Sequence, residues 1–169
     1  TNITLTRVWS LWVQAGVTQL SGGVAFATTG QSTLSNYTEG TFTPTVTLVG
    51  GAGNTVPVYT TNTGRYMRIG NRVFVDVYLT GDGGAEGAGT GTFSVALPIT
   101  AGANHPTSYF PCGHFVNGTA ENPISGQIPG SATVIDFVYE DVVNNFAVMT
   151  GAEQNNVTRT MRLKFSYEV

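Results

Sequence analysis

The chain has 169 residues, of which 41% are hydrophobic and only 10% are charged, and its formal net charge is −3. This charged fraction excludes a coiled coil, a helical bundle and a charged disordered segment. Each of these uses Glu, Lys and Arg to solvate its outer faces, and ordinary domains already carry ~25% charged residues. The length is that of one globular domain.

Threonine supplies much of the polar surface that charge does not, with 26 Thr residues in the sequence. Because β-branched hydroxyl residues favour the solvent faces of strands, this composition predicts an all-β fold. Seven basic residues without a Lys/Arg run give no surface for gripping phosphates, so we expect no nucleic-acid partner. No stretch approaches the ~18 to 20 apolar residues of a membrane span, so we expect no membrane insertion.

The first 35 residues contain short alternating apolar pieces, between Leu11 and Phe26, that glycines interrupt. Strands this short become stable when copies from neighbouring chains pack around a common axis. We therefore expect residues 1–35 to form the end of a stem and a linker, and residues 36–169 to form the folded domain. The alternative is an N-terminal strand and loop packed on that domain.

The regular part begins with an expected strand within residues 36–48, where Phe42, Val46 and Leu48 share one side and Pro44 confines the strand to a sheet edge or a strand beginning. Gly70-Asn71 then predicts a tight hairpin that leads into the clearest strand, Arg72–Thr80. One side of this strand is aliphatic, whereas the other alternates charged residues with Phe74 and Tyr78. Such aromatic residues are unusual on a solvent face, so we expect a second layer or another subunit to cover them.

The remaining chain alternates further strands with glycine-rich and proline-containing connections. Six glycines between Gly81 and Gly91 predict a mobile loop. The alternation of apolar residues predicts strands at Thr92–Ile99, Thr133–Glu140, Phe146–Met149 and Thr158–Tyr167, and irregular connections at Ala101–Gly113 and Gly118–Gly130. Strands in this number and spacing predict an antiparallel β-sandwich or jelly roll.

Two segments, Leu34–Pro44 and Gly64–Val73, with Tyr59 between them, carry a resemblance to a known family. In order and spacing, residues 34–80 resemble a domain found near the C-termini of bacteriophage tail fibres, tailspikes and related virion proteins. The pattern from Leu11 to Gly22 is also similar to the glycine-punctuated repeats of phage fibre stems. The resemblance implies a homotrimer on the virion, outside the cell, that contacts other virion proteins and reaches the host surface. It implies no particular receptor-binding residue.

Four carboxylates, Asp76, Asp136, Glu140 and Asp141, are the candidates for glycan cleavage, which uses two acids across the scissile bond. Asp136 and Glu140 share a strand face but lie roughly 13 Å apart at ~3.3 Å per residue. This exceeds the ~5 to 9.5 Å that the two glycosidase geometries use. A cross-strand pair stays open, but we expect no catalytic residue and no enzyme activity.

Cys112 lies two residues from His114, and His105 is close in sequence, which suggests a metal corner or a nucleophile pair. On a regular strand Cys112 and His114 point the same way, yet no further ligand or orienting acid stands nearby. Cys112 is also the only cysteine, which excludes an intrachain disulfide. We therefore expect no metal and no cofactor.

The best candidates for receptor contact are Asn104, His105, Tyr109 and Phe110, which cluster in an expected irregular segment. Such side chains stack on sugars and hydrogen-bond to them. The alternative is that Tyr109 and Phe110 close one end of the sandwich or a seam between subunits.

These observations lead to the hypothesis of a trimeric tail-fibre or tailspike tip that attaches to a host-surface glycan or protein receptor. Symmetry then converts weak single contacts into firm attachment. Two alternatives remain open at this point: a capsid-decorating or head-fibre protein, and a glycan-cleaving tip.

Overall fold

The computed structural model describes residues 24–25, 33–34, 36–81, 87–107, 109–117, 120–140, 146–155 and 158–169. The chain divides into two units, residues 1–35 and 36–169, and each is described by itself. In the first unit, β1 (Val24–Ala25) pairs with β2 (Thr33–Leu34) in antiparallel fashion. The repeat expected from Leu11 to Gly22 and the loop tip at residues 82–86 lie outside the described residues.

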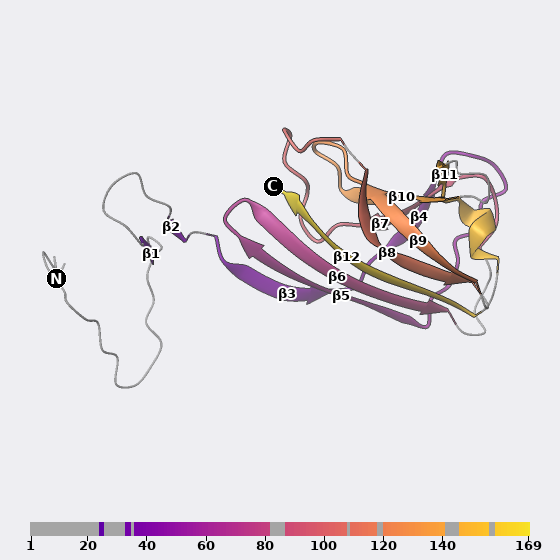
Figure 1. The fold of residues 1–169 in the computed structure, drawn as a ribbon. Coiled ribbons are helices and arrows are strands. Elements are labelled where there is room, and N and C mark those ends of the chain that lie inside the picture. The colour runs from indigo at the N-terminus through magenta and orange to yellow at the C-terminus, as the bar shows by residue number, and fades with distance from the viewer. Residues whose placement is uncertain are drawn as a thin grey trace, which may run out of the picture. The chain divides into compact units, whose positions relative to one another are not determined.

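The second unit is an antiparallel sheet with almost no helix, which confirms the all-β prediction (Figure 1). Its strands follow the order β3-β5-β6-β12-β8-β9-β10-β7-β4, and β11 pairs with β10 beside β7. The strands are β3 (Thr38–Phe42), β4 (Val46–Val49), β5 (Thr61–Ile69), β6 (Arg72–Gly81), β7 (Thr92–Ala96), β8 (Tyr109–Asn117), β9 (Ala120–Gln127), β10 (Val134–Glu140), β11 (Phe146–Val148) and β12 (Arg159–Glu168), with a single 3-10 turn described at Gly151–Gln154.

The sheet curls into a half-barrel because its two edge strands are consecutive in the chain. Only residues 43–45 separate β3 from β4, although these strands lie at opposite ends of the sheet order. The link contacts both edges: Asn62 Nδ2 donates to the carbonyl of Pro44 at 2.5 Å, and the Ala96 amide donates to the carbonyl of Thr45 at 2.8 Å. The single strand expected within residues 36–48 is therefore two strands, and the prediction that this segment forms an edge is confirmed.

The core fills the inside of the curl and comes from alternate positions of facing strands. On β6 and β12 the inward side chains are those that the alternation predicted, and opposite them stand residues of β9, β10 and β7. The predicted hairpin at Gly70-Asn71 is also present, with Gly70 at a φ of +63°. The main inward residues are Val73, Val75, Val77, Leu79, Met161, Leu163, Phe165, Tyr167, Ile124, Ile135, Phe137, Phe93 and Val95.

Two segments expected to be irregular are instead strands, since β8 begins at Tyr109 and β9 runs from Ala120 to Gln127. Pro111 and Pro123, which these strands contain, lie where their strand has a paired neighbour on one side only. The β12 ladder reaches β8 only as far as Gly113, and the β10 ladder reaches β9 only as far as Ile124. The missing proline N–H therefore interrupts no ladder on the unpaired side.

A bulge at Gly113 changes the course of β8. The register with β9 shifts between Pro111 and Gly113, and Gly113 has a φ of +151°. This shift places Cys112 in the core, 2% exposed, while His114 pairs across from Arg162 on the side of the sheet that faces away from the core. The expectation that Cys112 and His114 point the same way is therefore wrong, because the bulge breaks the alternation between them.

We expect Gly113→Ala to lower the free energy of unfolding by about 3 kcal/mol or more, because a Cβ would meet the carbonyl oxygen of Arg162 at a backbone angle that favours glycine. Gly53→Ala is the matched control, since Gly53 has a φ of +66° with open space around it. There the expected loss is only ~1 kcal/mol. Urea titrations compare the two, and equal losses would contradict a special role for the bulge.

Cys112 provides a probe of core closure, because burial raises the pKa of its thiol to about 12. We expect Ellman's reagent at pH 8 to label this thiol only when denaturant unfolds the chain. In the unfolded chain the thiol ionises near pH 9.0. The free energy of unfolding should therefore fall as pH rises from about 9 to 12, where only the unfolded state releases this proton. Rapid labelling of the native protein would contradict the buried position.

Candidate functional site

The outward side chains of β5, β6 and β12 form three cross-strand rows on one face, which we call the outer face. The strand registers place charged residues in the middle row and an aromatic residue of β6 in each flanking row. The rows are Met67–Phe74–Ser166, Arg65–Asp76–Lys164 and Thr63–Tyr78–Arg162, each in the order β5, β6, β12.

The two aromatic residues of the outer face are open to solvent. Phe74 is 42% exposed and Tyr78 is 39% exposed. The expectation that a second layer of the same chain covers them is therefore wrong, because the sheet curls its other half around the opposite face. Cover by another copy stays a prediction.

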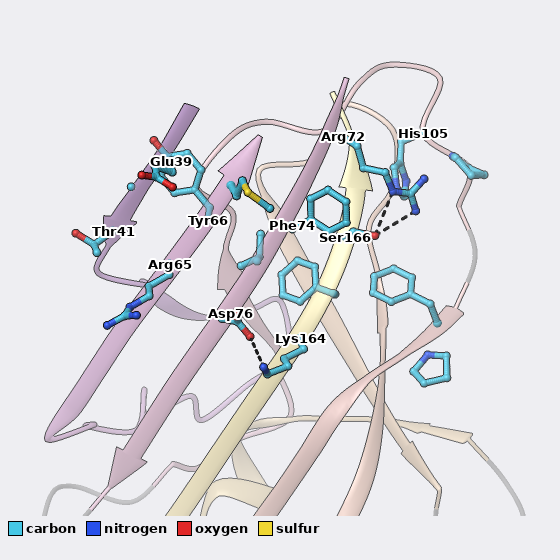
Figure 2. A pocket seen from close by; sticks show the side chains of 17 residues that line it. Glu39, Thr41, Arg65, Tyr66, Arg72, Phe74, Asp76, His105, Lys164 and Ser166 are labelled. Carbon is cyan, nitrogen blue, oxygen red and sulfur yellow. Dashed lines mark hydrogen bonds and ion pairs between the residues drawn. The ribbon is translucent and has the colours of Figure 1, made fainter. Parts of the chain in front are cut away.

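The outer face is hollowed by two adjoining grooves, of about 1130 Å³ and about 510 Å³. Phe74 lines the larger groove, shown in Figure 2, and Tyr78 lines the smaller one. Arg65, Asp76 and Lys164 line both. The two hollows therefore form one continuous surface, which we call the outer groove.

The wall of the larger hollow exists because β12 and β8 separate. Their ladder ends at Leu163 and Gly113, whereas β12 continues to Glu168. Beyond that point Phe110 of β8 lies against Phe165 of β12, with ring centroids 6.2 Å apart. The separated end of β8 and the loop before it thus rise beside the outer face and give the groove its side wall.

The charged side chains of the outer groove are held by contacts between strands (Figure 2). Lys164 Nζ lies 3.2 Å from Asp76 Oδ1, and Arg72 donates to Ser166 Oγ at 3.1 and 3.2 Å. The guanidinium of Arg162 lies over the Tyr78 ring, 5.5 Å from its centroid. Hydrogen bonds with Thr80 and with Arg162 lower the pKa of Tyr78.

The structure brings together two of the four residues predicted for receptor contact. His105 and Phe110 line the outer groove, whereas Asn104 and Tyr109 are exposed outside its lining. His105 is held in place, since Nδ1 lies 2.9 Å from the carbonyl of Ile128 and its ring packs 6.4 Å from that of Tyr167. The irregular segment thus forms the rim of the site rather than its floor.

Sequence reasoning missed the basic side chains of the floor, Arg65, Arg162 and Lys164. The sequence does show that each occupies a non-core position of an alternating strand. It does not show which strands are neighbours: β5 and β12 both pair with β6, although β12 lies some 80 residues later in the chain.

The other candidate groups are involved in structural contacts. Asp136 Oδ1 accepts a hydrogen bond from Ser94 Oγ at 2.5 Å, and Asp76 pairs with Lys164. The side chains of Glu140 and Asp141 lie outside the described residues. Within the described ranges, no three His, Cys, Asp or Glu side chains are grouped to hold a metal ion. The same part of the chain contains no helix long and apolar enough to span a membrane.

The fold and the outer groove define a small antiparallel β domain with an open surface of aromatic and charged side chains. The sequence matches no protein-family model, and no curated protein matches it significantly.

We expect Lys164→Gln to change the free energy of unfolding by less than ~1 kcal/mol, because exposed ion pairs contribute little. The Lys164 side chain is 86% exposed. Its neighbour Leu163 is 1% exposed, so Leu163→Ala should lose about 2 to 5 kcal/mol. Thermal or urea unfolding of both variants makes the comparison. A large loss of unfolding free energy for Lys164→Gln would show that the charged row stabilises the fold and would contradict its role in binding.

Proposed function

We propose that this protein is a virion structural protein of a tailed bacteriophage, the tip of a tail fibre or tailspike that attaches the particle to the host cell surface. It acts outside the cell by binding, without covalent chemistry. The resemblance of residues 34–80 to phage fibre domains supports the class. The observation that carries the binding role is the outer groove, in which exposed aromatic side chains alternate with charged ones.

A host-surface glycan is the receptor that this groove suits best. Sugars present an apolar ring face and polar edges, so they need a flat aromatic partner beside hydrogen-bonding groups. Phe74 and Tyr78 lie four residues apart on β6, roughly 13 Å at ~3.3 Å per residue, with Asp76 between them. This spacing suits a chain of several sugars that contacts both aromatic residues.

The proposed particle carries the domain as a homotrimer that joins other virion proteins. Three copies raise the effective concentration of the grooves at the cell surface. In this arrangement the outer groove stays open, in place of the cover by another copy that the sequence predicted. The cores of subunit interfaces are depleted in Lys, Asp and Glu, and this groove holds Lys164, Asp76 and Glu39. Exposed apolar residues elsewhere are available for contacts between copies, namely Val49, Val56, Val58 and Val148.

The proposed relation to β-sandwich or jelly-roll knobs rests on the two halves of the curled sheet. β3, β5, β6 and β12 lie side by side opposite β7, β9 and β10, with one core between the halves (Figure 1). The continuous pairing through β8 distinguishes this sheet from a sandwich of two separate sheets.

The test is binding of the full chain to a panel of immobilised bacterial surface polysaccharides. We expect at least one to bind, and Phe74→Ala and Tyr78→Ala each to weaken it about threefold to tenfold as stacking is lost. Tyr109→Ala is the matched control, since Tyr109 is 57% exposed outside the groove lining and should leave binding unchanged.

Two further measurements address the assembly and the alternatives. Sedimentation should give the mass of three chains, and antibodies against the domain should label the tail of the particle. Absence of binding to every polysaccharide, or label on the capsid, would contradict the attachment role. Release of oligosaccharides from the panel would overturn the assignment as a non-enzyme.

A further inference from the structure

The outer groove is positively charged in an acidic chain. Its lining holds four basic side chains against two carboxylates, a formal charge of +2, whereas the whole chain has −3. The basic residues are Arg65, Arg72, Arg162 and Lys164, and the carboxylates are Glu39 and Asp76.

The exposed basic residues of the described chain are confined to the outer groove more strictly than the net charge of its lining indicates. Within the described part of the chain, every exposed basic side chain lies in the outer groove. The two other described basic residues serve the fold. Arg68 is partly buried and donates from Nε to the carbonyl of Gly70 at 2.8 Å, and Arg159 is buried against the ring of Tyr59.

Two of these cations are not neutralised by an ion pair. Asp76 stands between Arg65 and Lys164 in the middle row and pairs with Lys164. Arg72 pairs with Glu168, which is not part of the lining, at 3.7 Å, and with Glu168 counted the local charge is +1. Among the described residues, no carboxylate forms an ion pair with Arg65 or with Arg162. Arg162 instead lies over the ring of Tyr78. Guanidinium groups bind carboxylates through two parallel hydrogen bonds, so both arginines can accept an anionic group of a ligand.

We propose that the outer groove binds an acidic oligosaccharide, a sugar chain whose rings carry carboxylates. This rests on the proposed attachment function and names its ligand class. Phe74 and Tyr78 stack on rings of the chain, and the arginines bind the carboxylates beside them. The alternation of aromatic and charged rows corresponds to the alternation of ring faces and acidic substituents along such a chain.

Binding of defined oligosaccharides to the full chain tests this inference. The probes are oligogalacturonate and α2,8-linked oligosialic acid, with the carboxyl-reduced form of each and neutral maltoheptaose as comparisons, in calorimetric titrations at 50 and 200 mM salt. We expect at least one acidic probe to bind, its carboxyl-reduced form to bind about tenfold or more weakly, and added salt to weaken the acidic probe.

Two charge variants locate the effect. Arg65→Gln and Arg162→Gln should each weaken the acidic probe about tenfold, the loss expected for one charge-assisted hydrogen-bonded contact. Arg68→Gln is the matched control, since it changes the net charge equally, but its partly buried side chain lies outside the groove lining. Arg68→Gln should leave the affinity for the acidic probe within about twofold of that of the unsubstituted protein.

Several outcomes would overturn the inference: equal affinity for the acidic and carboxyl-reduced probes, no binding of either acidic probe, or equal weakening by Arg68→Gln and Arg65→Gln. Equal binding of single-stranded oligo(dT) would show a response to charge alone. If Arg65→Gln or Arg162→Gln abolishes the trimer, the outer face contacts a second copy of the chain rather than an oligosaccharide. Binding of neutral polysaccharide that depends on Phe74 and Tyr78 would leave the attachment function standing without this ligand class, whereas no binding to any polysaccharide removes both.

Discussion

The three-residue link between β3 and β4 constrains the rest of the fold. A link of this length forces the two edges of the sheet to the same place, so the sheet must curl. The curl gives every long strand one inner and one outer face, and the inner faces share a single core without a covering helix.

The outer groove follows from a second local feature, the bulge at Gly113. Without it, β8 would continue alongside β12, and the sheet would present an even outer surface. With it, the ladder ends at Leu163, and Phe110 and Phe165 fill the gap between the separating strands. The hollow is therefore built from backbone geometry and a packed aromatic pair, so the exposed side chains above it do not have to maintain its shape.

Composition was enough to predict the all-β class, and alternation was enough to predict the long strands β6, β10 and β12, because one buried face imposes a period of two. The same reasoning missed β8 and β9, whose sequences alternate poorly. Both contain a proline, and whether a proline interrupts a ladder depends on a neighbour that local sequence does not identify. The site was predicted only at its rim, through His105 and Phe110. Its floor needed the register that places Arg65 and Lys164 on either side of Asp76.

The composition of the outer face is difficult to explain by stability. Leaving Phe74 and Tyr78 partly in water forgoes part of the ~1.5 to 3 kcal/mol that burial of a large apolar side chain contributes. The ion pair between Asp76 and Lys164 adds little in return at its exposure. Aromatic and basic residues gathered on one hollowed face of a threonine-rich sheet are therefore better explained by a ligand that they contact than by the fold that they belong to.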